Sequence, residues 1–117
     1  LYRKEVIMLK MNLEYNKGIL FVRLDGMLHR GSTYKINNYL VPVILKHKIK
    51  YLVYNFYNLD DIDEDGIDAL LNSEEAIKTN KGVMYICEVN KRLERKLKHF
   101  RARKFDNELT CMKLIEV

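Results

Sequence analysis

The N-terminal part of the chain alternates between apolar and polar positions. In residues 8–15 apolar side chains come at every second position, and Asn16-Lys17-Gly18 then supplies a turn. Residues 19–25, ILFVRLD, are again rich in apolar and β-branched side chains. An alternating segment, a short turn that contains glycine and a second segment rich in β-branched and apolar residues together predict an antiparallel hairpin.

Two segments then show the spacing of a helix that buries one face. The first can be capped by Ser32 or Thr33, and its apolar positions are Ile36, Tyr39, Leu40, Val43 and Ile44. Pro42 falls inside this segment and removes a backbone hydrogen bond, so we expect a kink or a break there. The second segment has its apolar positions at Ile67, Leu70, Leu71 and Ile77. It runs to about Thr79, where Asn80-Lys81-Gly82 closes it.

Residues 48–59 and 83–89 are short, apolar and rich in β-branched or aromatic side chains, which predicts buried strands. Asn90 can begin a basic helix whose inner face holds Leu93, Leu97 and Phe100. Residues 112–117 are expected to form a last short strand. The predicted order is β-β-α-β-α-β-α-β, in a single α/β domain over residues 1–117 with a mixed β-sheet, an N-terminal hairpin and packed helices. Residues 1–8 can alternatively form an N-terminal extension.

Composition adds the general class of protein. Of the 117 residues, 48% are hydrophobic and 32% are charged, which is typical of a globular domain and argues against global disorder. No apolar run approaches the roughly 20 residues that span a bilayer. The first fifteen residues alternate and lack the continuous apolar stretch of a signal peptide. We therefore expect a cytoplasmic protein.

The nucleophilic and metal-binding residue types form no recognisable pattern. The two cysteines have no zinc-site or redox-motif spacing, and Cys87 lies in an apolar strand, where a buried reduced thiol is expected. His29, His47 and His99 are far apart in sequence and match no metal-binding motif. We expect no enzyme activity and no cofactor.

Residues 61–68, DIDEDGID, are the densest group of acids and at first resemble a calcium loop. An EF-hand loop needs a glutamate at its twelfth position and a helix in front of it. Counted from Asp61, the twelfth position is Asn72, and a predicted strand precedes the loop. A divalent-metal site made by Asp61, Asp63 and Asp65 stays as the less favoured alternative. The simplest interpretation is an acidic turn that caps a helix.

Residues 91–104 carry eight lysines and arginines. Such a run suits nucleic acid, an anionic membrane surface or an acidic protein partner. No RNA-binding or helix-turn-helix pattern accompanies it, and spacing places Phe100 inside. A solvated helix face is the favoured interpretation, and nucleic acid is not the expected partner.

Several stretches, taken in order, resemble the STAS domain of anti-sigma factor antagonists. They are GILFVRLDGML, a strand that ends in Asn58-Leu59, the pattern D-x-x-G-I at the start of a helix, and KGVMYICEVN. In that family a D-S-S-G-like turn opens the helix, and the serine before the glycine accepts phosphate. The resemblance implies a STAS-like fold that binds an anti-sigma factor of the serine-kinase type, in sporulation or stress partner switching.

Carried onto this sequence, the resemblance makes Asp63 the family's aspartate, Glu64 the first serine, Asp65 the phosphoacceptor-equivalent and Gly66 the glycine. Neither Glu64 nor Asp65 can take a phosphate ester from a serine kinase. A phosphoserine carries about −1.5 to −2 charges and an aspartate −1, so Asp65 would keep a permanent, phosphomimetic charge.

The sequence therefore predicts a non-enzymatic regulatory binding module, phosphomimetic or non-switching. Its expected partner-binding residues are Asp63, Glu64, Asp65, Gly66 and Asp68. The alternative is a STAS-like ligand-sensing or transport-accessory module. A homodimer is left open.

Overall fold

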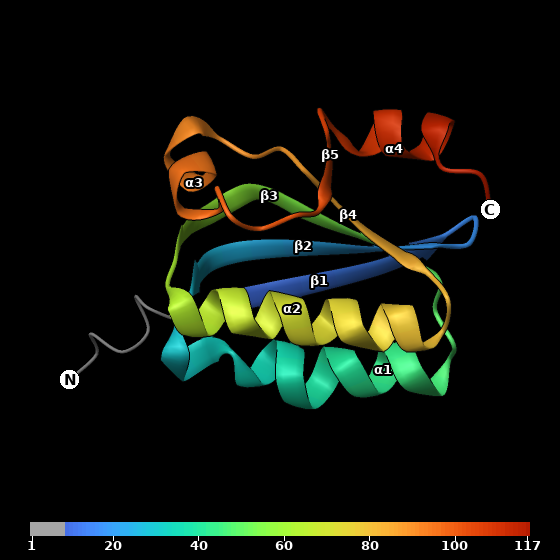
Figure 1. The fold of residues 1–117 in the computed structure, drawn as a ribbon, viewed down its shortest axis with the longest axis horizontal. Coiled ribbons are helices and arrows are strands. Elements are labelled where there is room, and N and C mark those ends of the chain that lie inside the picture. Colours follow the sequence, from blue (N-terminus) through green and yellow to red (C-terminus); the bar gives the residue numbers. More distant parts are fainter. Residues whose placement is uncertain (1–8) are drawn as a thin grey trace.

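The computed structural model describes residues 9–117 and contains one five-stranded sheet in the order β1-β2-β3-β4-β5 (Figure 1). The strands are β1 (Leu9–Asn16), β2 (Ile19–Leu28), β3 (Tyr51–Ile62), β4 (Val83–Cys87) and β5 (Arg103–Phe105). β1 and β2 pair antiparallel, and every later neighbour is parallel. The predicted hairpin and mixed sheet are confirmed.

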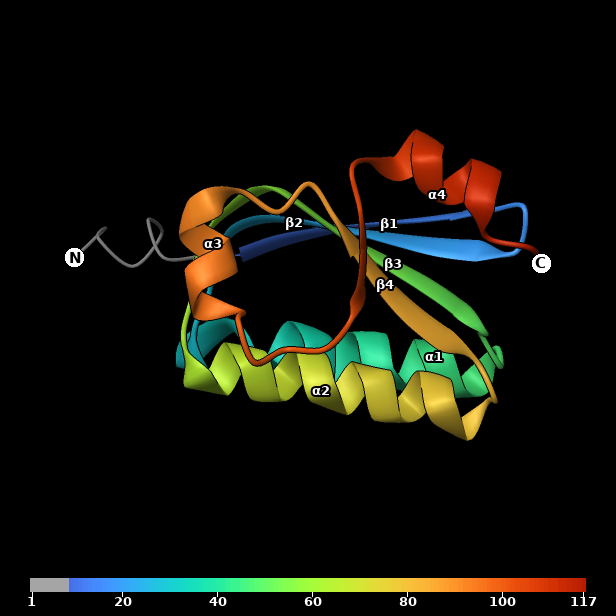
Figure 2. The same cartoon turned by 45° about the horizontal axis from the view of Figure 1, so that its top comes forward.

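The helical elements lie on both faces of the sheet (Figure 2). They are η2 (Arg30–Ser32), η3 (Lys35–Leu40), α1 (Val41–Lys46), α2 (Glu64–Thr79), α3 (Lys91–Lys96) and α4 (Glu108–Leu114). α1 and α2 cover one face, α4 lies on the opposite face, and α3 stands at one end of the sheet. The predicted break near Pro42 takes the form of a change from π-helical bonding in η3 to α-helical bonding in α1, with the proline in the first turn of α1.

Burial on both faces explains the apolar runs of the central strands. In β2, Leu20, Val22 and Leu24 face the core under α1 and α2, whereas Ile19 and Phe21 face α4. The second core is small and consists of Ile19, Phe21, Val53, Tyr85, Cys87, Cys111 and Ile115. Both cysteines are free and fully buried. Hydrogen bonding with Cys111, together with burial, raises the pKa of the Cys87 thiol, which keeps it protonated.

Polar contacts also hold α4 on the sheet. Arg23 of β2 donates from Nε and Nη2 to the two carboxylate oxygens of Glu108, at 2.8 and 2.7 Å. Asn55 of β3 adds a hydrogen bond of 2.7 Å to the same carboxylate. The bonds from Arg23 and then from Asn55 hold the pKa of the Glu108 carboxyl below its usual range. Glu108 therefore ties the first turn of α4 to two strands.

The prediction of a last strand over residues 112–117 is wrong. Residues 108–114 form α4, and the final strand of the sheet, β5, comes earlier. Asn107 caps α4 by accepting a hydrogen bond of 2.8 Å from the Thr110 amide. Cys111 in α4 and Ile115, the residue directly after this helix, both pack in the second core against the sheet. The predicted succession of strands and helices is present only because β5 supplies its last strand in place of residues 112–117, and α4 follows β5.

Two boundaries also differ from the prediction. β3 continues to Ile62, so that Asp60 and Asp61 belong to the strand and not to the turn. The basic run is not one helix, because α3 ends at Lys96 and the chain returns to the sheet as β5. Leu93, Leu97 and Phe100 are buried as predicted. Residues 1–8, with the proposed N-terminal extension, lie outside the described residues.

Candidate functional site

The predicted acidic turn lies between the end of β3 and the start of α2. Asp63 is the N-cap residue of α2, and its Oδ1 accepts a hydrogen bond of 2.8 Å from the Gly66 amide. Its other carboxylate oxygen accepts the Arg30 amide at 3.0 Å. The Asp63 amide in turn donates to the Leu28 carbonyl at 3.2 Å. Asp63 thus caps the helix and also fixes the segment that follows β2.

Asp61 binds two side chains from other parts of the chain. Its Oδ2 lies 2.9 Å from His29 Nε2, and its Oδ1 pairs with the Lys96 ammonium group. These bonds, with that of Lys96 the stronger influence, hold the pKa of the Asp61 carboxyl below its ordinary value. Asp61 therefore joins the end of β3 to α3 and to the loop after β2.

Gly66 is buried where α2 approaches the end of β2. A Cβ at this position would lie 2.2 Å from the Leu28 carbonyl oxygen and 2.7 Å from Ile62 Cγ1. Real Cβ atoms do not approach a backbone oxygen so closely. The packing itself therefore requires glycine here.

The remaining predicted site residues face solvent. Glu64, Asp65 and Asp68 are exposed, whereas Ile67 is half-buried and Leu70 is fully buried. We call Glu64, Asp65 and Asp68 the acidic edge. The five predicted site residues thus lie together in the first turns of α2, with Asp63 and Gly66 turned inward and the acidic edge outward. An aspartate or glutamate in this position is stabilised by the helix dipole, by about 0.3–1 kcal/mol.

The structure adds contacts that the sequence did not reveal. Two of these contacts are made to Asp61, by His29 and Lys96, and the third is made to Asp63 by the Arg30 amide. In each case the two residues are 32 to 35 positions apart in the sequence. No local motif connects His29, Arg30 or Lys96 with residues 61–63. The only available signal was the opposite charge of the basic run.

The less favoured metal site of Asp61, Asp63 and Asp65 is not assembled. Within residues 9–117, no group of three or more His, Cys, Asp or Glu side chains converges in a way that could hold an ion. The carboxylates of Asp61 and Asp63 are engaged by protein donors instead.

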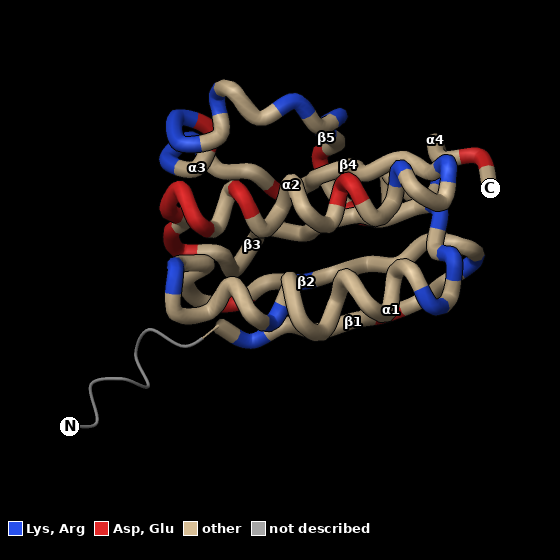
Figure 3. Tube along the Cα trace, turned by 60° about the horizontal axis from the view of Figure 1, so that its bottom comes forward, with Lys and Arg blue, Asp and Glu red and all other residues tan. Residues whose placement is uncertain are grey.

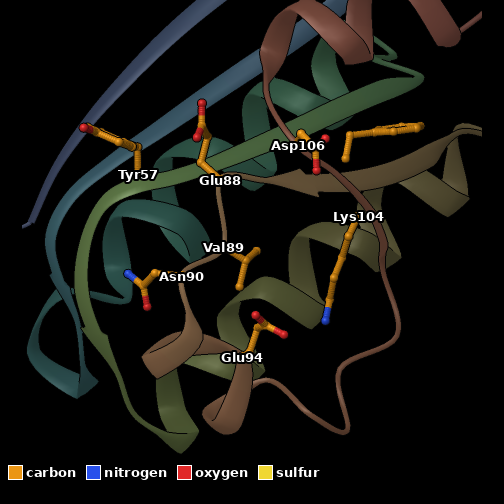
Figure 4. Close-up of a pocket in the computed structure, with 8 residues that line it drawn as sticks. Tyr57, Glu88, Val89, Asn90, Glu94, Lys104 and Asp106 are labelled. Atoms are coloured by element: carbon orange, nitrogen blue, oxygen red, sulfur yellow. The ribbon is translucent and has the colours of Figure 1, made fainter.

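Two hollows bear on ligand binding. A shallow one of about 410 Å³ lies beside the acidic edge and is lined by His29, Asp61, Ile62, Asp63, Glu64, Ile67 and Lys96. A larger one of about 480 Å³ lies between the end of β4, α3 and β5 (Figure 4). Its lining residues are Tyr57, Glu88, Val89, Asn90, Glu94, Lys104, Phe105 and Asp106. Glu88 has a left-handed backbone, with φ of 60°, which is uncommon outside glycine.

Comparison with known proteins places the chain in a family. The sequence model described as the STAS domain matches residues 10–114. An anti-sigma F factor antagonist of Paenibacillus polymyxa is 26% identical over 113 residues, which cover 93% of this chain and 97% of that protein.

Two solved structures share the fold. The anti-sigma factor antagonist SpoIIAA in its unphosphorylated form superposes with a TM-score of 0.74 at 18% identity, over 91% of this chain and 100% of that chain. An anti-sigma factor antagonist from Mycobacterium paratuberculosis gives 0.74 at 11% identity, over 90% and 92% of the two chains. Within the described residues, none of the helices has the length and apolar character needed to cross a membrane.

Proposed function

The chain belongs to the STAS domain family, and from this premise we propose that it is a non-enzymatic regulatory module that binds an anti-sigma factor of the serine-kinase type. The antagonist relative covers nearly the whole of this chain, so the likeness extends over the whole module. The proposed partner site is the start of α2, with Asp63, Glu64, Asp65, Gly66 and Asp68.

The observation that carries this proposal is that some residues of the acidic turn hold its structure while others are exposed to solvent. Asp63 and Gly66 are fixed by hydrogen bonding and close packing, and they set the position of the first helical turn. Glu64, Asp65 and Asp68 are exposed, so a partner can contact them without disturbing the fold. A rigid turn that presents exposed side chains is suited to recognition by another protein.

We place Asp65 at the phosphoacceptor-equivalent position and propose that the protein does not switch with ATP. A carboxylate keeps its charge at neutral pH, whereas a serine gains charge only when a kinase modifies it. Asp65, assisted by Glu64, would hold this surface close to the charge of a phosphorylated antagonist. In the resemblance stated above, phosphorylation of the serine ends capture of the kinase, so we propose that the partner of this protein is adapted to bind a constant negative charge.

The test is a pull-down with the purified anti-sigma factor kinases encoded in the same genome, before and after addition of ATP. The proteins compared are the wild type, Glu64→Ser/Asp65→Ser, and a control with Glu75→Ser. Glu75 is an exposed acid farther along α2. The double variant is expected to show altered capture, to incorporate phosphate at position 65 and then to lose the kinase. The wild type should capture the same amount of kinase with and without ATP, and so should Glu75→Ser.

Identical behaviour of the wild type and the double variant, with no phosphate incorporated, would refute the phosphomimetic role of Asp65. Failure of every kinase to bind either protein would refute the choice of partner.

The second candidate is a ligand-sensing module, which the hollow in Figure 4 favours. A ligand there should raise the thermal midpoint of unfolding. A screen of nucleotides and small amines by thermal shift, with Glu94→Ala as the comparison, tests this function. A shift that is equal in Glu94→Ala would place the ligand elsewhere.

A further inference from the structure

The basic run of residues 91–104 has no role in the proposal above, although it is the strongest concentration of charge outside the acidic turn. Its bases are all exposed: Lys91, Arg92, Arg95, Lys96, Lys98, Arg101, Arg103 and Lys104. Figure 3 shows α3 at the same end of the molecule as the start of α2, so that positive and negative segments adjoin. We call Lys91, Arg92, Arg95 and Lys96 of α3 the basic face.

The shape of the run does not suit a membrane or a nucleic acid. Its large apolar side chains, at Leu93, Leu97 and Phe100, are buried in the core and cannot insert into a bilayer or stack on bases. α3 has six residues and is therefore about 9 Å long, too short to follow a DNA groove far. An acidic protein surface makes neither demand.

The contacts of Lys96 connect the basic face to the acidic edge. Lys96 pairs with Asp61, which also contacts His29, so α3 is held against the end of β3. The hollow of about 410 Å³ joins the two elements, since Glu64 and Ile67 line it from α2 and Lys96 lines it from α3. This hollow brings two apolar side chains, Ile62 and Ile67, together with charged ones, and protein–protein contacts combine both kinds of group.

We infer that the basic face and the acidic edge form one bipolar interface, which selects a protein partner with an acidic patch beside a basic one. This inference rests on the proposed function and names the second half of the same site. Paired opposite charges fix the register of a partner more strictly than one sign alone, because a shifted or inverted partner brings like charges together. They also accelerate association, and salt weakens that effect.

The experiment measures association rates with the kinase captured in the pull-down, at about 50 mM and about 300 mM NaCl. The wild type serves as the background, because Glu64→Ser/Asp65→Ser removes two of the three acids of the acidic edge. The test variant is Arg92→Glu/Arg95→Glu. The matched control is Lys46→Glu/Lys78→Glu, which makes the same change in net charge at the far ends of α1 and α2, where both lysines are exposed.

Reversal on α3 is expected to lower the association rate constant about tenfold or more at the lower salt and much less at the higher. The association rate constant of the control should stay within about twofold of that of the background protein, since charges far from an interface act weakly on association. An equal loss in both variants would mean that net charge alone matters, and would overturn the inference. So would an unchanged rate in Arg92→Glu/Arg95→Glu, and in that case capture that still depends on Asp65 would leave the proposed function intact.

Light scattering on the same proteins tests the other occupant of this surface, a second copy of the chain. A dimer in the background protein that becomes monomeric with Arg92→Glu/Arg95→Glu would assign the surface to self-association and overturn the inference. Absence of kinase binding in every variant would overturn the proposed function and this inference with it.

Discussion

Replacement of Gly66 by alanine tests how closely the first turn of α2 packs against the end of β2. The added Cβ would lie 2.2 Å from the Leu28 carbonyl oxygen, 2.7 Å from Ile62 Cγ1 and 3.0 Å from Leu28 Cγ. The carbonyl oxygen belongs to the backbone and accepts the Asp63 amide at 3.2 Å, so it cannot turn aside as a side chain would. The start of α2 must therefore move.

Two opposing effects set the magnitude. Alanine is favoured over glycine inside a helix by about 1 kcal/mol. Overpacking of a tight site costs about 1–3 kcal/mol, and occasionally more. Because the closest contact here is with a fixed backbone atom, we take the upper part of that range. The free energy of unfolding of Gly66→Ala should fall by about 1–2 kcal/mol, which lowers the thermal midpoint by several degrees, at roughly 4 °C per kcal/mol.

The assay is urea denaturation followed by circular dichroism, with Gly31→Ala as the control. Gly31 is exposed, and a Cβ there would meet nothing within 4 Å. Its substitution should change the free energy of unfolding by less than about 0.5 kcal/mol. A Gly66→Ala variant as stable as the wild type, with an unchanged denaturant slope, would refute the close packing from which the turn's rigidity is argued.

Three further outcomes are expected. Asp63→Ala should lower the free energy of unfolding by about 1–2 kcal/mol, because it removes the helix cap, and Asp65→Ala by less than about 0.5 kcal/mol; equal losses in urea denaturation would contradict the division between them. The lowered pKa of Glu108, beside Arg23, gives stability that is present above the ordinary value of 4.5 and is lost as the pH falls through the lower folded value. Glu108→Gln should therefore flatten the acid side of a plot of stability against pH, and an unchanged slope would count against this contact. Amide exchange should be slowest in β2, β3 and β4, and fast exchange throughout β4 would contradict the placement of the core.

The sequence predicted the elements whose hydrophobic period is unambiguous. The hairpin, the two central strands and the helix that ends near Thr79 follow from alternation, from dense β-branched residues and from a repeat of three to four. Asn90 was also recognisable as a cap, and its side chain accepts a hydrogen bond of 2.8 Å from the Leu93 amide.

The C-terminal segment was mispredicted because its pattern supports two periods. The residues MKLIEV alternate well enough for a strand, yet Cys111 and Ile115 also match one turn of a helix. Tertiary contacts decide between them. Glu108 bonds to Arg23 and Asn55 on strands far away in sequence, and that anchor places the segment across the sheet instead of in it.

The roles of the individual acids in the acidic turn cannot be predicted from the local sequence. Composition shows that residues 61–68 are acidic, but it does not show which of their carboxylates are bound by other groups of the protein. Contacts within the protein engage two of them. Asp61 contacts His29 and Lys96, and Asp63 accepts hydrogen bonds from two backbone amides. Lys96 offsets the charge of Asp61, and backbone amides hold the Asp63 carboxylate in place, so within residues 9–117 the carboxylates of this turn without such a contact are those at positions 64, 65 and 68. The partner therefore encounters three exposed carboxylates on a turn that two others hold in place. The same ion pair between Lys96 and Asp61 holds α3 near this turn, and with it the exposed Lys91, Arg92 and Arg95, so a partner meets charges of both signs at this end of the molecule.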